Sequence, residues 1–462
     1  MTKIPQSDLQ PARGKAVDLA AQCDIQKAAT MRSLLLAVLL MMIAPAAIGQ
    51  ALPTAEASPI STGFALPRVA GTLQYAVSAS ESLTWGYYGN SGPATSTNLT
   101  GDVAYLSNST RSPFSLVFAG GHSWSGSGQP SFSFLNLGIS QVANVGRWNF
   151  VISDNVNYTP ATPTTGLSGI LGVGDLGLNP VQVGVDNGQG VLTNYATRVS
   201  NTVVGSVQRQ ITGKTSVNAS GSYGIIRFLD SNVSSSSTGL DSDSTTGGGG
   251  VSHRIDARTT LGGNYSYSTY NFTGNTFGIP APSFVSQTAS LVYTHQFTRK
   301  FSVNASAGPQ WTRIDSLNST QDLSLFADIS GEYTGEFSHA SVGYVRSTNS
   351  GFGVTGGSRS DSVMFLANRA IARVWNTALT SSYTRSESLP SALVIPFSFN
   401  TTLGGVQVSR AIVRSLSAYA SFTVANQSSK GGGASVNAFS GFSQVLGLGL
   451  TYSPTSIHVG RP

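Results

Sequence analysis

Residues 285–307 read VSQTASLVYTHQFTRKFSVNASA, two runs of alternating residues on either side of a short basic turn. In the first run apolar residues, including Leu291 and Tyr293, alternate with small polar ones. The alternation resumes at Phe301, directly after Arg299 and the lysine that follows it. Because successive side chains of a strand point to opposite faces, this stretch predicts a β-hairpin. One face of the hairpin is apolar, and the other carries Ser, Thr, Asn and Gly.

The same turn recurs along the chain as a hydrophobic residue followed two or three positions later by Arg or Lys. The pairs are Ile211/Lys214, Ile255/Arg258, Phe297/Arg299, Ile371/Arg373 and Ile412/Arg414. A weaker turn at 334–337 lacks the basic residue. The anchor positions 211, 255, 297, 337, 371 and 412 are 44, 42, 40, 34 and 41 residues apart. Each interval holds two strands of about 10 residues, a tight turn and a longer loop. Such unequal spacings argue against a β-solenoid, whose period is nearly fixed.

The composition indicates which face of these hairpins meets water. Of 462 residues only 10% are charged, whereas about 25% is usual in soluble domains. The chain also has 52 Gly, 21 Phe and 16 Tyr. This composition favours a membrane β-barrel, with the apolar faces outward to lipid and the polar faces inward to water. After residue 50 no run approaches about 18 unbroken apolar residues, so no helical span is expected there.

The first 49 residues contain an export signal. Arg32 precedes the apolar run 34–43, and small residues follow as far as Gly49. This order predicts a secretory signal peptide cleaved after Gly49 or the residue that follows it. A transmembrane anchor is the alternative, but the run is short for a span. Met31 marks residues 1–30 as an upstream extension.

The rest of the chain divides into three parts. Residues 50–71 lack a period and are predicted to form a periplasmic lead-in, 72–453 form the barrel, and 454–462 form a C-terminal tail. One opening strand, eight hairpins and one closing strand give 18 strands. Sixteen is the alternative, because the strands around Val103 and Ser242 are weak. An even number places both ends of the barrel on the periplasmic side.

This organisation resembles that of Gram-negative outer-membrane β-barrel proteins of porin size. The resemblance rests on the signal peptide, on short turns that alternate with longer loops, and on the closing strand. There, Gly447-x-x-Leu450-x-Tyr452 is similar to the C-terminal assembly signal of these proteins, although this chain continues to residue 462. The resemblance implies an all-β fold, a closed antiparallel transmembrane barrel with short periplasmic turns and longer extracellular loops. It also implies export to the outer membrane, contact with its lipid, and insertion by the barrel-assembly machinery.

Several sequence features that could indicate a binding or reactive site are better explained by a structural role. The net charge of +6 is slight and comes without a basic cluster among aromatics, so no nucleic-acid partner is expected. Two G-x-G-x-x-G matches, at 172–177 and 351–356, do not lie between a strand and a helix. The single cysteine, Cys23, precedes the signal, so no disulfide or thiolate site is expected after it. A run of four glycines at 247–250 is expected to kink its strand.

No catalytic, cofactor or metal site is expected either. His122 lies one and three residues from Ser123 and Ser125, so in a strand it points to the opposite face from both. Asp241 and Asp243 form an acidic pair without the later ligands of a full calcium loop, so a solvated acidic loop is favoured. The five histidines show no metal-ligand spacing, and His253 and His295 occupy equivalent places beside their turns.

The longest interval without periodicity, 159–195, is the strongest candidate for a functional loop. In general porins the third long loop folds into the lumen and narrows it, and this is the third long loop by count. An external lid or a disordered loop is the alternative. The predicted pore-lining residues are Asp175 and Asp186 in this loop, with Arg198, Arg227, Asp328 and Glu332 on the wall.

The sequence therefore predicts an outer-membrane channel for the passive passage of small polar solutes. A conduit for polysaccharide export ranks second, because no periplasmic repeat domain accompanies the strands. A surface adhesin or structural β protein is a third reading. No enzyme activity is expected, since no set of residues suits one.

Overall fold

The computed structural model describes most of the chain from residue 71 to residue 459. The described ranges are 71–86, 92–109, 111–126, 131–160, 197–229, 240–273, 275–276, 279–280, 283–315, 320–351, 356–372, 374–389, 397–431 and 439–459. The predicted signal peptide, nearly all of the lead-in, and the loop 161–196 with Asp175 and Asp186 lie outside them.

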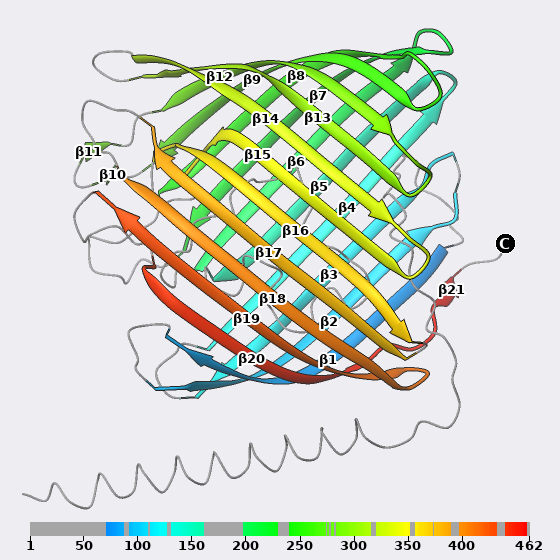
Figure 1. Cartoon of the computed structure of the whole chain (residues 1–462), viewed down its shortest axis with the longest axis vertical. Coiled ribbons are helices and arrows are strands. Elements are labelled where there is room, and N and C mark those ends of the chain that lie inside the picture. The colour runs from blue at the N-terminus through cyan, green and yellow to red at the C-terminus, as the bar shows by residue number, and fades with distance from the viewer. Residues whose placement is uncertain are drawn as a thin grey trace, which may run out of the picture. The chain divides into compact units, whose positions relative to one another are not determined.

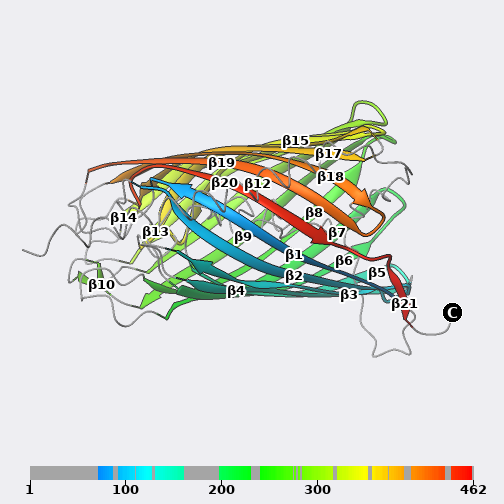
Figure 2. The same cartoon turned by 90° about the horizontal axis from the view of Figure 1, so that it is seen from below.

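Eighteen strands form one closed antiparallel ring, in which each strand pairs with its neighbour along the chain (Figures 1 and 2). The strands are β1 (Gly71–Trp85), β2 (Ala94–Ser107), β3 (Phe114–Ser125), β4 (Phe132–Val145), β5 (Trp148–Pro160), β6 (Thr197–Gln210), β7 (Thr215–Phe228), β8 (Asp241–Arg254), β9 (Thr259–Thr273), β12 (Phe284–Gln296), β13 (Phe301–Ile314), β14 (Thr320–Thr334), β15 (Ser338–Asn349), β16 (Ser358–Ala372), β17 (Trp375–Ser388), β18 (Ser398–Val413), β19 (Leu416–Lys430) and β20 (Gly441–Tyr452). A two-stranded hairpin, β10 (Asn275–Thr276) and β11 (Ile279–Pro280), lies between β9 and β12. The prediction of eighteen strands is confirmed, and the alternative of sixteen is wrong.

The ring closes between its first and last strands. β1 pairs with β20 from Val77↔Tyr452 to Trp85↔Gln444. Closure satisfies the backbone groups that an open sheet leaves unpaired at its edges. It also excludes the β-solenoid, whose repeats stack along an axis instead of returning to the first.

The chain beyond the closing strand adds one short strand to the sheet. β21 (Ile457–Val459) pairs with the start of β1, from Gly71↔Val459 to Leu73↔Ile457. The continuation of the chain past Tyr452 is therefore structured in part: it extends the sheet below the point where β20 ends.

Short turns and longer loops segregate to opposite ends of the barrel. Three of the short turns are closed in the same way, because the side-chain oxygen of their second residue accepts two backbone amides. Thr212 accepts the amides of Lys214 and Thr215 at 3.2 and 3.0 Å. Asp256 and Thr298 do the same in the next two turns. The amide of Arg258 and the Thr259 hydroxyl hold the pKa of the Asp256 carboxyl below its usual range, which favours the ionised acceptor.

The apolar faces of the strands point outward. Leu291 and Leu323 are 70% and 65% exposed, whereas Ser286 and Thr288, on the opposite face of β12, are buried. In β20, Leu446, Leu448 and Leu450 alternate with the inward residues Val445, Gly447, Gly449 and Thr451, and none of the three leucines is buried. The orientation predicted from the sequence is confirmed: large apolar side chains are outside and small polar ones inside. Among the described residues no helix is long and apolar enough to cross a membrane.

The glycine run of β8 does not interrupt the sheet. Gly247–Gly250 pair with β7 on one side and β9 on the other, with no register shift in either ladder. The predicted kink is therefore wrong. The neighbours explain the choice of residue: a Cβ on Gly248 would lie 2.7 Å from the Tyr265 carbonyl oxygen.

One seam of the ring is only half paired. β13 and β14 pair along their whole length, from Phe301↔Tyr333 to Ile314↔Thr320. β14 and β15 pair only from Ala327↔Arg346 to Thr334↔His339, which leaves the long-loop half of the seam without a ladder among the described residues.

Candidate functional site

The inner face of the barrel near its closure is lined by hydroxyls and amides that bond to one another. Ser82 and Ser96 place their Oγ atoms 2.6 Å apart, and Asn98 donates from Nδ2 to Ser82 at 3.2 Å. Ser78 and Thr451 join β1 to β20 in the same way at 2.7 Å. These contacts fix neutral polar groups along the wall, the lining expected for a water-filled interior.

Charge on the inner face is sparse and mostly acidic. Asp328 and Glu332 lie on β14, on the face opposite Leu325 and Ile329. Glu332 contacts His339 of β15 at 3.0 Å, whereas no ion pair of Asp328 occurs within the described part of the chain. Both carboxylates sit where the sequence placed them, and their role in passage stays a prediction.

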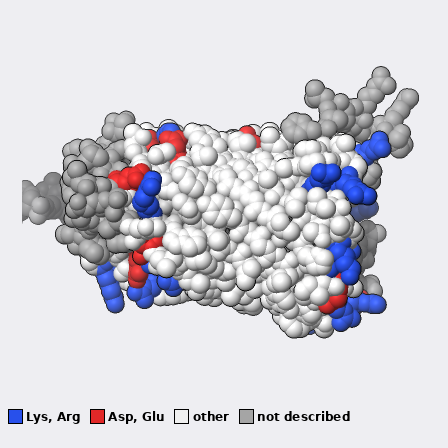
Figure 3. All heavy atoms as spheres, turned by 90° about the horizontal axis from the view of Figure 1, so that it is seen from above, with Lys and Arg blue, Asp and Glu red and all other residues white. Residues whose placement is uncertain are grey.

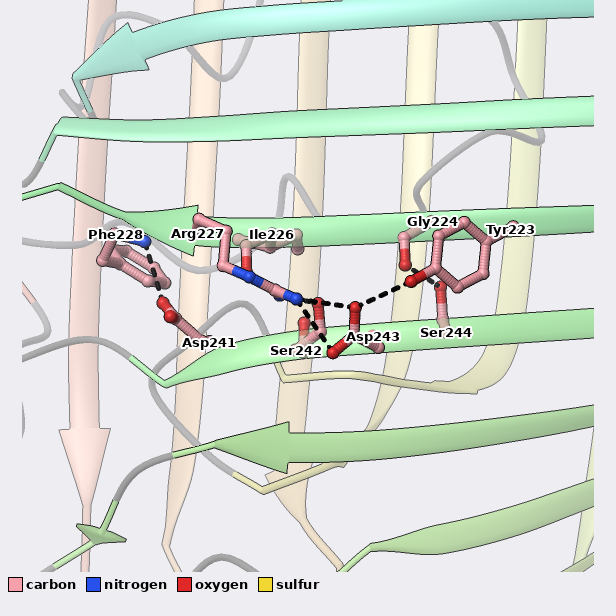
Figure 4. Close-up of polar contacts among 9 residues, drawn as sticks. All are labelled: Tyr223, Gly224, Ile226, Arg227, Phe228, Asp241, Ser242, Asp243 and Ser244. Atoms are coloured by element: carbon pink, nitrogen blue, oxygen red, sulfur yellow. Dashed lines mark hydrogen bonds and ion pairs between the residues drawn. The ribbon is translucent and has the colours of Figure 1, made fainter.

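Arg227 lies on the outer face of the barrel. It shares a face of β7 with Ile225 and with Tyr223, which is 49% exposed. Its Nη2 donates to both carboxylate oxygens of Asp243 of β8, at 2.8 and 3.0 Å, and the Tyr223 hydroxyl donates to the same carboxylate (Figure 4). The prediction that Arg227 lines the pore therefore disagrees with its position on the outer face of the barrel. The periodicity that identifies β7 already separates it from Arg198, whose place on β6 is inward by the register Val199↔Arg227.

The acidic pair 241–243 is a strand feature and not a solvated loop. Asp241 accepts the Phe228 amide at 2.9 Å, and Asp243 is held by Arg227. Both carboxylates are thus occupied by the chain itself. The described residues contain no cluster of three or more side chains suited to a metal ion.

His122 contacts a serine that the sequence did not point to. Its Nδ1 lies 2.8 Å from Oγ of Ser133, across the β3–β4 ladder. The same cross-strand contact joins Thr215 to His253 at 2.9 Å and Thr259 to His295 at 3.0 Å. Three repeats of one geometry indicate a structural pairing of hydroxyl and imidazole, and confirm that His253 and His295 are equivalent.

The lumen narrows at the long-loop end, because the tips of β15 and β16 lie inside the wall. Gln310 points inward from β13, and its Oε1 accepts the Thr348 hydroxyl of β15 at 3.1 Å. Asp322, inward on β14, forms an ion pair with Arg359 of β16. Thr348 and Arg359 pair with each other, on the face opposite the inward Ser347 and Ser360. Their contacts with inward residues of β13 and β14 therefore require the tips to lie on the lumen side of those strands.

Apolar residues also pack where the strand tips overlap the inner side of the wall. Phe284 of β12 and Ile314 of β13, each 1% exposed, pack with Leu389 at the end of β17. A Cβ on Gly357, just before β16, would lie 2.5 Å from the Phe284 ring and 2.7 Å from Leu389. Gly357 also has a φ of 103°, which favours glycine for a second reason.

Charged residues gather at the two ends of the barrel and leave a nearly uncharged band between them (Figure 3). Aromatic residues border this band beside the short turns. Trp148 and Tyr452 are 40% and 47% exposed there. The guanidinium carbons of Arg209 and Arg410 lie 4.9 and 5.3 Å from the rings of Trp148 and Trp375.

Comparisons with known proteins give structural neighbours only. No protein-family model matches the chain, and no curated protein matches its sequence. Solved structures that match include Pseudomonas aeruginosa OpdQ, at 10% identity and a TM-score of 0.39, with 84% of this chain and 99% of that chain covered. A BenF-like porin from Pseudomonas fluorescens Pf-5 matches at 10% identity and 0.41, with coverage of 84% and 99%. Acinetobacter baumannii OccAB3 matches at 9% and 0.40, with coverage of 83% and 99%. At these TM-scores the likeness carries no function to this chain.

Proposed function

We propose that this chain is an outer-membrane channel through which small polar solutes pass down their gradients. The observation that carries the proposal is the closed ring of 18 strands, with large apolar side chains outside and hydroxyls and amides inside. In hydrocarbon every backbone donor and acceptor needs an internal partner, which a closed barrel provides. Barrels of 16 to 18 strands are wide enough to enclose an aqueous lumen.

The two ends support one orientation in the membrane. The rim of short turns carries both ends of the barrel and the aromatic residues Trp148, Trp375 and Tyr452. Aromatic girdles sit at the membrane interfaces of such barrels, and their short turns face the periplasm. The strand ends that carry the longer loops then face outward from the cell, and export depends on the signal peptide within residues 1–49. Contact with outer-membrane lipid and insertion by the barrel-assembly machinery are part of the same proposal.

Gel mobility tests the closed barrel itself. The purified chain in detergent is expected to migrate differently before and after boiling, because the closed ring of strands resists detergent until heated. Deleting residues 441–459, which removes β20 and β21, should abolish the difference by opening the ring. Identical mobility of the full-length chain under both conditions would contradict a stable barrel.

Ion selectivity in planar bilayers tests the lumen. The channel is expected to conduct and to favour cations modestly, because Asp328 lies inward without an ion-pair partner among the described residues. Asp328→Asn should move the reversal potential in a salt gradient toward zero. Glu336→Gln, in the turn before β15, is the control and should leave it unchanged. Absence of any conductance from folded protein would refute the channel.

A further inference from the structure

The overlap at the β14–β15 seam differs from the rest of the wall in how it is held together. Most neighbouring strands of the ring share backbone ladders along nearly their whole length, but the tips of β15 and β16 are held against β13 and β14 by side chains. Gln310 is the centre of this contact. Its Nε2 donates to Ser286 at 3.0 Å and to Thr288 at 3.3 Å, and its Oε1 accepts from Thr348.

We propose that the tips of β15, β16 and β17 form a gate that sets the width of the passage, and that this structure shows it closed. The proposal rests on the channel function proposed above. The latch comprises Gln310 with Thr348, Asp322 with Arg359, and the apolar contact of Phe284 and Ile314 with Leu389. Outward movement of the tips removes three strand ends from the lumen.

The backbones of β14 and β15 indicate where the tip of β15 would lie in the open gate. Pairing of β14 with β15 stops at Ala327↔Arg346, although both strands continue beyond it. Continuing the same register would place Thr348 opposite Leu325, on the outer face of the wall. New backbone hydrogen bonds along this half of the seam offset the latch contacts that opening breaks. Two arrangements with comparable bonding are what a two-state element needs.

The latch is weak enough to be reversible. Arg359 and Asp322 retain 22% and 26% of their side-chain exposure, and an ion pair of this kind contributes little net stability. The polar contacts are neutral apart from that pair. Phe284, Ile314 and Leu389, by contrast, are nearly inaccessible to solvent and add apolar burial to the closed state.

A reversible cross-link tests the gate. The variant Gln310→Cys/Thr348→Cys joins β13 to the tip of β15, and Cys23, the only natural cysteine, lies before the predicted cleavage site. The gate predicts two conductance levels, a smaller one with the tips inside the lumen and a larger one with the tips moved outward. After treatment with a short, reducible reagent that links two thiols, single-channel records are expected to stay at the smaller level. Reduction should restore transitions to the larger level. Cross-linked channels that open as often as untreated ones would overturn the gate.

A matched pair elsewhere on the wall controls for the chemistry. Thr246 and Ser268 point inward from β8 and β9, and their hydroxyl oxygens are 2.9 Å apart. Because these strands already share a full ladder, cross-linking Thr246→Cys/Ser268→Cys should leave conductance unchanged. If neither the untreated nor the reduced variants conduct at all although gel mobility shows folded barrels, the channel function fails, and not merely the gate.

Weakening the latch is expected to favour the open gate, the opposite of the effect of the cross-link. Arg359→Ala is expected to raise the ratio of time in the larger level to time in the smaller one about two- to fivefold, the size expected from losing one partly exposed ion pair. Arg359→Lys should restore most of the native ratio, since it keeps the charge opposite Asp322. An unchanged ratio in Arg359→Ala would overturn the latch.

Discussion

Replacing Gly308 by alanine is expected to abolish folding of the barrel or to lower its yield severely. A Cβ at this position would lie 1.9 Å from the carbonyl oxygen of Ala289 and 2.8 Å from Cα of Ser290. Both are backbone atoms of β12, so no side-chain rotation relieves the clash. Strands β12 and β13 must separate locally, at a cost of about 3 kcal/mol or more. Yield of the heat-modifiable form from refolding into detergent measures the effect.

The close approach at Gly308 follows from the residue after it. Pro309 has no amide hydrogen, and the β12–β13 ladder is interrupted between Thr288↔Gln310 and Leu291↔Ala307. The two backbones come together there without the usual hydrogen bonds. Gly205→Ala is the matched control, because nothing lies within 4 Å of a Cβ built on Gly205. Equal folding yields for the two variants would show that β13 accommodates a side chain at position 308.

The sequence was sufficient for the barrel because its main signals are local. Alternation identified the strands, and turn signals such as the pair Ile255/Arg258 located the hairpins. The outward position of Leu291 and Leu323 could be inferred because a polar, charge-poor inner face has no place in a soluble core. The glycine run of β8 misled, because the propensity that disfavours glycine in strands ignores the close approach of neighbouring backbones.

The site was harder to infer because it depends on contacts between strands, and one of these contacts joins strands that are not neighbours. Alternation along β7 separates Arg227 from the inward positions, but its partner Asp243 follows only from the register with β8. The overlap of Thr348 with Gln310 has no local signal at all. It arises where one ladder stops short of the ends of its strands, which a pattern along a single strand does not record.

Replacing Leu291 by arginine is expected to destabilise the barrel in phospholipid vesicles by about 2–4 kcal/mol, the cost of a lipid-facing charge near the bilayer midplane. Leu291 is near the middle of β12 and 70% exposed. In water its exposure would make the substitution nearly neutral, so the cost comes from the surrounding hydrocarbon. The free energy of unfolding, from urea titration of folding into vesicles, measures it.

The neighbouring residue gives the decisive control. Val292 faces inward, between Gly262 of β9 and Ser306 of β13, where small neighbours leave room for a longer side chain. Val292→Arg therefore places the same charge one residue away, on the side of the wall that faces the aqueous lumen. It should alter conductance or ion selectivity and change the free energy of unfolding far less than Leu291→Arg. The opposite order, with Leu291→Arg neutral and Val292→Arg unfolding the protein, would mean that the interior is the apolar environment. The barrel would then be a soluble one, and the membrane channel would have to be abandoned.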